Sequence, residues 1–143
     1  MKVFVTGAAG QLGHDVVEEL RRRGHTAVAS DRTGECPLDI TDGAAVLRVL
    51  GDARPDAVIH CAAWTAVDAA EEPENREAVQ RINGGGTRHI AEACKALGCK
   101  MLYISTDYVF DGQGEAPWQA DCKAYAPLSV YGSSKLAGEL AVE

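Results

Sequence analysis

Two patterns of apolar and polar positions alternate along the chain. Short apolar runs at residues 2–6, 26–30, 57–62 and 101–105 predict β-strands, and a weak, very short strand is expected around residues 37–38. Apolar residues spaced three or four positions apart predict helices between them. One ends at Gly24, one runs from an N-cap at Thr41 or Asp42 through Leu50, and one runs with interruption from Glu71 to Leu97. A last helix follows the loop that ends at Pro127.

The order of these elements indicates an α/β protein. Strands that are apolar throughout, each separated from the next by a helix, are typical of a parallel sheet covered by helices on both faces. We therefore predict a Rossmann-like, doubly wound parallel sheet. Residues 84–86 are three consecutive glycines inside the longest helical stretch, where they would cost a helix about 2–3 kcal/mol relative to alanine. Either the helix breaks there, or its backbone approaches a neighbour closely.

Composition narrows the class of protein. The 143 residues are enough for one domain with its own core, and the formal net charge of −7 argues against a nucleic-acid surface. No apolar run approaches the roughly 20 residues of a membrane span, and the N-terminus does not have the pattern of a signal peptide. The five cysteines include no C-x-x-C pair, so we expect reduced thiols, a cytoplasmic location and no metal site.

A glycine-rich turn follows the first predicted strand. The segment TGAAGQLG places Gly7, Gly10 and Gly13 in the pattern G-x-x-G-x-x-G, which differs from the G-x-G-x-x-G of the standard dinucleotide fingerprint. The physical reasons for glycine are the same: a tight turn with positive φ, no side chain to block a pyrophosphate, and free N–H groups at the start of a helix. The sequence predicts a phosphate-binding turn.

Asp31 ends the second predicted strand, where its carboxylate can accept hydrogen bonds from ribose hydroxyls. That carboxylate would repel a 2′-phosphate and so favours NAD. Arg32 could partly neutralise such a phosphate, so NADH and NADPH both stay open as cofactors.

Tyr131 and Lys135 lie four residues apart on the last predicted helix and therefore on one face of it. A free tyrosine titrates near 10, so exchanging a proton near neutral pH requires its pKa to fall by about three units. The lysine cation and a positive nicotinamide ring can supply that stabilisation. The segment Ser105-Thr106-Asp107 ends the last predicted strand, and a hydroxyl there could bind the same carbonyl oxygen that Tyr131 would protonate.

The segments TGAAGQLG, LDITD, CAAWTAVDAAE, STDYVFDG and PLSVYGSSKLAGE resemble the extended short-chain dehydrogenase/reductase family over the whole chain. The resemblance implies reduction of the 4-keto group of a deoxysugar nucleotide, with Thr106, Tyr131 and Lys135 as the catalytic triad. It implies a sugar-nucleotide site near Thr65, Val67, Thr106, Asp107 and Tyr108. The cofactor residues that it implies are Gly7, Gly10, Gln11, Leu12, Gly13, Asp31, Asp39, Ile40, Ala62, Ala63, Tyr131 and Lys135.

Members of this family are considerably longer than this chain. We therefore expect residues 1–143 to form the NAD(P)-binding domain without the C-terminal substrate domain, truncated after the catalytic helix and with little activity of their own. The strand at 101–105 would then be an open apolar edge, which favours self-association, for example as a homodimer. Alternative functions are a sugar-nucleotide epimerase or dehydratase of the same superfamily, a non-catalytic NAD(P)-binding regulatory protein, and a fragment with no independent role.

Overall fold

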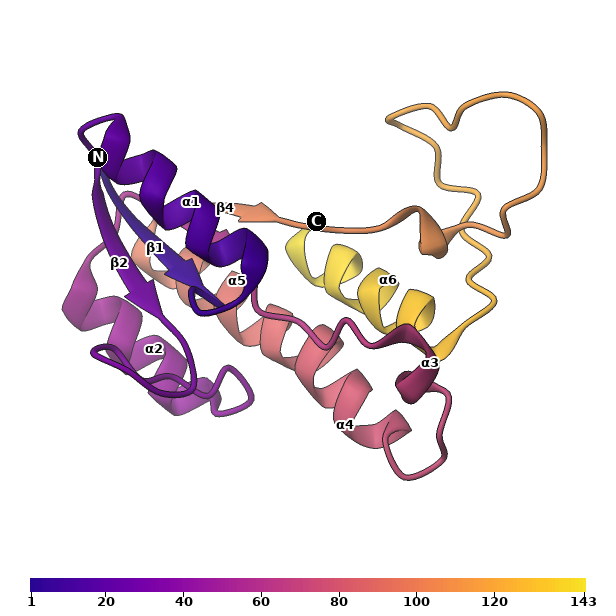
Figure 1. Cartoon of the computed structure of the whole chain (residues 1–143), viewed down its shortest axis with the longest axis horizontal. Helices are drawn as coiled ribbons and strands as arrows, with labels where there is room; N and C mark the ends of the chain where they lie inside the picture. Colours follow the sequence, from indigo (N-terminus) through magenta and orange to yellow (C-terminus); the bar gives the residue numbers. More distant parts are fainter.

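A four-stranded parallel sheet forms the centre of the protein, whose computed structural model describes residues 1–143 (Figure 1). The strands are β1 (Lys2–Thr6), β2 (Thr26–Ser30), β3 (Ala57–His60) and β4 (Lys100–Tyr103), in the order β2-β1-β3-β4. The predicted α/β class and Rossmann-like parallel sheet are confirmed.

Helices connect the strands and follow the last of them. They are α1 (Gln11–Arg22), α2 (Gly43–Ala53), α3 (Val67–Ala70), α4 (Arg76–Gln80), the π-helical segment η1 (Arg81–Gly86), α5 (Thr87–Leu97), the 3-10 turn η2 (Asp107–Val109) and α6 (Val130–Val142). Figure 1 shows α4, η1 and α5 as one long helix beside α6, while the loop between η2 and α6 projects away from the body. No helix combines the length and apolar character that a membrane crossing needs.

The two faces of the sheet carry separate cores, because successive strand residues point to opposite sides. Val3 and Val5 pack with Val17 of α1 on one face. Phe4 between them belongs to the larger core on the other face, under α2 and α5. That core contains Phe4, Leu38, Ile40, Val46, Leu50, Val58, Ile90, Ala93 and Cys94. Residues of β1 thus alternate between the two cores, with Val3 and Val5 in one and Phe4 in the other.

Strands β3 and β4 each end two residues earlier than predicted, because side chains rather than a neighbouring strand bind the next backbone groups. β3 ends at His60 rather than at residue 62, since the Ala62 N–H donates to the side chain of Thr6 at 3.2 Å. β4 ends at Tyr103 rather than at residue 105, and the Ile104 carbonyl accepts from Lys135 instead. The weak strand expected at 37–38 is a single bridge between Asp31 and Pro37. The short elements α3 and η2 were not predicted.

The glycine run at residues 84–86 lies within the π-helical segment, so the helix continues through it. A Cβ at Gly84 would lie 3.1 Å from that of Ala137 in α6, and one at Gly86 would lie 2.6 Å from Ile40. Gly85 faces open space. Close approach, rather than a break, therefore explains two of the three glycines.

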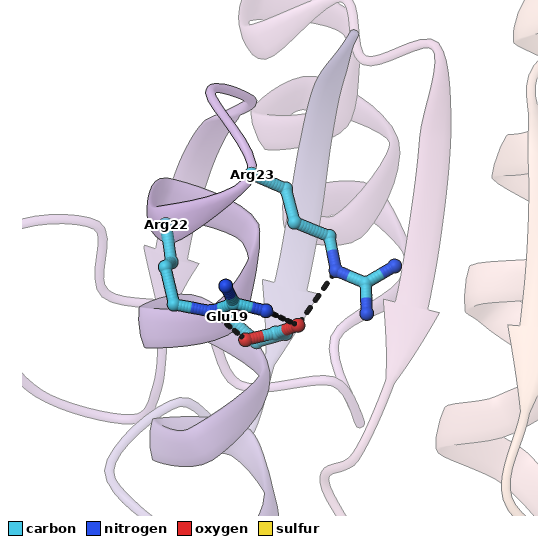
Figure 2. A network of polar contacts seen from close by, with 3 residues as sticks. All are labelled: Glu19, Arg22 and Arg23. Atoms are coloured by element: carbon cyan, nitrogen blue, oxygen red, sulfur yellow. Dashed lines mark hydrogen bonds and ion pairs between the residues drawn. The ribbon is translucent and has the colours of Figure 1, made fainter.

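The basic cluster at the end of α1 is paired with acidic residues of its own helix (Figure 2). Glu19 binds the Nε atoms of both Arg22 and Arg23 at 2.6 Å, and these hydrogen bonds lower the pKa of its carboxyl to about 2. All three side chains are well exposed, so the cluster is a solvated helix end. Its cations also lie at the negative end of the helix dipole.

Candidate functional site

A cavity of about 880 Å³ opens at the carboxyl ends of the strands. Its lining comes from the turn after β1, the segments after β2 and β3, and the first two turns of α6. Every residue predicted to bind the cofactor lies in that lining: Gly7, Gly10, Gln11, Leu12, Gly13, Asp31, Asp39, Ile40, Ala62, Ala63, Tyr131 and Lys135. The glycine turn and the tyrosine–lysine pair, more than a hundred residues apart in sequence, thus border one cavity.

Two glycines of the turn have no room for a side chain. Gly7 has φ +66°, and a Cβ there would lie 2.6 Å from the backbone nitrogen of Ala62. A Cβ at Gly13 would overlap the carbonyl oxygen of Gly7. Gly10 begins α1 without a side-chain cap, so the N–H groups of the first helical turn have no side-chain partner. A tight backbone cradle at the positive end of a helix dipole fits a pyrophosphate group.

Two carboxylates, Asp31 and Asp39, line the same cavity and accept hydrogen bonds from nearby backbone and side-chain donors. Asp31 accepts from the N–H groups of Ala9 at 3.0 Å and Arg32 at 2.8 Å. Asp39 accepts from the N–H and the hydroxyl of Thr41, and these bonds hold the pKa of its carboxyl below the usual value. The side chains of Arg32 and Arg81 line the same cavity, so charges of both signs line it.

Three polar contacts fix α6 against the cavity. Ser129 caps the helix by accepting from the Gly132 N–H at 2.9 Å, and the carboxylate of Glu71 accepts from the Val130 N–H at 2.7 Å. Asn83, in the π-helical segment, donates to the hydroxyl of Ser134 at 2.9 Å and to the Trp64 carbonyl at 3.0 Å. The buried amide therefore ties the wall of the cavity to the helix that carries Tyr131 and Lys135.

Lys135 is buried, and its ammonium donates to the Ile104 carbonyl at 2.5 Å. Burial lowers the pKa of Lys135 to about 8. Burial also raises the pKa of Tyr131, and hydrogen bonding with Thr106 only partly opposes that rise. Lys135 is not among the groups that shift the pKa of Tyr131, so the chain alone does not lower that pKa; the expectation also invoked a positive nicotinamide ring, which belongs to the cofactor.

The residues predicted to lie near the substrate are divided between two cavities. Thr65 lines the large one. Asp107 and Tyr108 line a second cavity of about 300 Å³, together with Phe110 and Trp118 among others. Val67 and Thr106 line neither of these two cavities. Tyr131 of the large cavity and Tyr108 of the second cavity pack edge to face, with ring centroids 5.9 Å apart.

The large cavity also has lining residues outside the predicted cofactor and substrate sets. The hydroxyl of Ser105 is buried at the cavity and has no hydrogen-bond partner. Thr106, the next residue, is absent from this lining, since extended backbone turns neighbouring side chains to opposite sides. His60, Trp64 and Arg81 also line the cavity, and no local pattern distinguishes them from packing or surface residues.

The fold and the cavity together define a Rossmann-like α/β domain with a cavity at the carboxyl ends of its strands. The family model described as "RmlD substrate binding domain" matches residues 1–143, and the chain belongs to that family. The family comprises NAD(P)-binding Rossmann reductases of dTDP-rhamnose biosynthesis.

Known proteins support this assignment. The chain is 50% identical over 140 residues to a dTDP-4-dehydrorhamnose reductase of Streptomyces griseus, covering 97% of this chain and 44% of that protein. The crystal structure of the Bacillus anthracis dTDP-4-dehydrorhamnose reductase with NADP matches with a TM-score of 0.89 and 41% identity, over 99% of this chain and 48% of that one. A Thermus thermophilus UDP-glucose 4-epimerase with NAD matches at 0.85 and 29% identity, over 98% and 49%. The chain thus spans about half the length of these relatives.

Proposed function

We propose that this chain forms the cofactor half of an enzyme that reduces dTDP-4-dehydro-L-rhamnose to dTDP-L-rhamnose with NADH or NADPH. The observation that carries the proposal is the single cavity bordered by both the glycine turn and the Tyr131–Lys135 pair. The similarity to the dTDP-4-dehydrorhamnose reductases of Streptomyces griseus and Bacillus anthracis supports the choice of substrate. Residues 1–143 act in this proposal as one NAD(P)-binding domain in the cytoplasm.

The dinucleotide, when bound, supplies the hydride, and the residues of this chain provide orientation and the proton. Tyr131 gives its proton to the 4-keto oxygen; because burial raises the pKa of its phenol, the transfer depends on stabilisation of the phenolate that forms. Lys135 holds the ribose and stabilises the phenolate that remains. Thr106 orients the carbonyl, and Thr65, Val67, Asp107 and Tyr108 contact the sugar nucleotide.

The first test is binding of NADH and NADPH to the purified chain, measured by isothermal titration calorimetry. We expect both to bind, because Asp31 disfavours a 2′-phosphate while Arg32 and Arg81 attract one. Asp31→Ala should shift the preference toward NADPH by removing the carboxylate, and Asp15→Ala, on the exposed side of α1, is the matched control. Absence of binding for both dinucleotides would refute the proposal.

Similarity to an NAD-containing epimerase makes an isomerising enzyme the second candidate. An epimerase keeps its dinucleotide through the catalytic cycle, whereas a reductase exchanges it. Denaturing the purified chain and measuring released NAD separates the two: little released cofactor agrees with the reductase, and stoichiometric NAD favours the epimerase.

The exposed side of β4 is the basis of a second prediction, that the chain self-associates as a homodimer. β4 lies at the edge of the sheet, and Leu102 within it is 51% exposed. An apolar edge with unpaired backbone groups favours pairing with another chain. Light scattering should show a dimer whose dissociation is promoted by Leu102→Lys. A wild-type chain that stays monomeric at high concentration would contradict this.

A further inference from the structure

Tyr103, the last residue of β4, contacts Lys135 at two points. The Lys135 ammonium lies 4.1 Å from the centroid of the Tyr103 ring, which is the geometry of a cation–π interaction. The Tyr103 hydroxyl donates to the backbone carbonyl of Lys135 at 3.0 Å. One side chain thus contacts both the charged end and the backbone of the same residue.

The surroundings of Tyr103 are shaped for this contact. Gly138 lies on α6 three residues after Lys135, and a Cβ there would overlap the Tyr103 hydroxyl. The imidazole of His60 stacks against the ring, with centroids 6.1 Å apart and planes inclined by 21°. Burial raises the pKa of the Tyr103 hydroxyl, so it remains a hydrogen-bond donor. The glycine admits the hydroxyl and the histidine supports the ring.

Lysine needs such support more than most side chains do. Its ammonium sits on a four-carbon stem with several rotatable bonds, and the stem alone does not define where the charge lies. The Ile104 carbonyl supplies one hydrogen bond to the ammonium. The Tyr103 ring supplies a second contact to the same ammonium, 4.1 Å from its centroid.

We propose that Tyr103 is a positioning residue for Lys135: its ring locates the ammonium, and its hydroxyl fixes the turn of α6 that carries the lysine. This inference rests on the proposed role of Lys135 in holding the cofactor. Tyr103 itself is not among the residues lining the cavity, so its effect on the cofactor passes through Lys135.

Nuclear magnetic resonance tests the contact without any cofactor. The ε-methylene protons of Lys135 should be shifted upfield by the ring current of Tyr103, and Lys135→Met identifies their signal by its loss. The upfield signal should persist in Tyr103→Phe, which keeps the ring. It should move to the ordinary lysine position in Tyr103→Leu, and also in Gly138→Ala, which displaces the ring. Tyr125→Leu, which removes a tyrosine stacked on Phe110 in the projecting loop, is the matched control and should change nothing.

A double-mutant cycle on NADH affinity then separates positioning from general packing. Tyr103→Leu should weaken NADH binding roughly tenfold in the wild-type background and less than about twofold in the Lys135→Met background. Equal losses in both backgrounds, or an unmoved Lys135 signal in Tyr103→Leu, would overturn the inference. If Lys135→Met binds NADH as tightly as the wild type, the proposed cofactor role of Lys135 fails, while the Lys135 signal still decides whether Tyr103 locates the ammonium.

Discussion

The variant Gly13→Ala should lose most of its affinity for NADH and a large part of its stability. The new Cβ would overlap the carbonyl oxygen of Gly7 and lie 2.9 Å from the Cα of Ala8, both of which belong to backbone. Backbone atoms cannot move aside as a side-chain end does, so either α1 or the turn must shift. We expect a loss of about 2–4 kcal/mol in the free energy of unfolding and a rise of more than about tenfold in the NADH dissociation constant.

Gly51→Ala is the matched control for this change. Gly51 also lies within a helix, α2, and a Cβ there meets nothing within 4 Å. Alanine is a better helix former than glycine, so this variant should gain about 0.5–1 kcal/mol and bind NADH normally. Urea unfolding and calorimetric titration of both variants give the comparison. A Gly13→Ala protein with wild-type stability and affinity would show that the turn does not form the cradle described above.

The fold could be predicted in outline because the signals for its elements are local. The β-branched and apolar residues of Lys2–Thr6 indicate a strand, and Gly98 indicates the left-handed cap that ends α5. Strand ends were predicted two residues too late because they depend on distant partners. Thr6 receives the Ala62 N–H across a separation of 56 residues, and Lys135 reaches the Ile104 carbonyl across 31. A local sequence pattern spans far fewer residues than either separation, so it cannot indicate these hydrogen bonds.

The same distinction explains the site. The glycine turn could be located because its requirements, a positive φ and a missing Cβ, are properties of single residues. Asn83 could not, because its role depends on Ser134, 51 residues later, and on an unusual helical turn. The family resemblance implied that Val67 and Thr106 lie near the substrate, but neither lines either of the two cavities, because their positions depend on how η2 and the segment after β3 pack. That arrangement is set by tertiary contacts rather than by local pattern.

Two buried titratable residues that line the cavity, His60 and Lys135, also affect the stability of the fold. Lys135 and His60 are both more than nine-tenths buried, and burial disfavours the charged form of each. His60 makes two hydrogen bonds, between Nδ1 and the Thr6 hydroxyl at 2.7 Å and between Nε2 and the Thr87 hydroxyl at 3.1 Å. The neutral imidazole therefore links the end of β1, beside the glycine turn, to the start of α5.

The protein should lose stability as the pH falls below about 6.5, and His60 should cause most of the loss between pH 7 and pH 5. Burial, aided by the positive charge of Lys135, lowers the pKa of His60 from 6.5 to about 3. Between these two values the unfolded chain binds a proton that the folded protein does not, so the free energy of unfolding decreases as pH decreases. The slope is about 1.4 kcal/mol per pH unit, which amounts to about 2 kcal/mol at pH 5.

His60→Gln separates this titration from the hydrogen bonds. Glutamine has a donor and an acceptor for Thr6 and Thr87 but takes up no proton, so the variant should be less stable at pH 7 by about 1–2 kcal/mol yet lose little more on acidification to pH 5. The exposed His14→Gln should follow the wild-type profile. The carboxyl groups with lowered pKa, Glu19 and Asp39, act at lower pH and do not obscure the comparison. Urea unfolding at a series of pH values measures it, and parallel profiles for His60→Gln and the wild type would show that His60 does not carry the acid sensitivity.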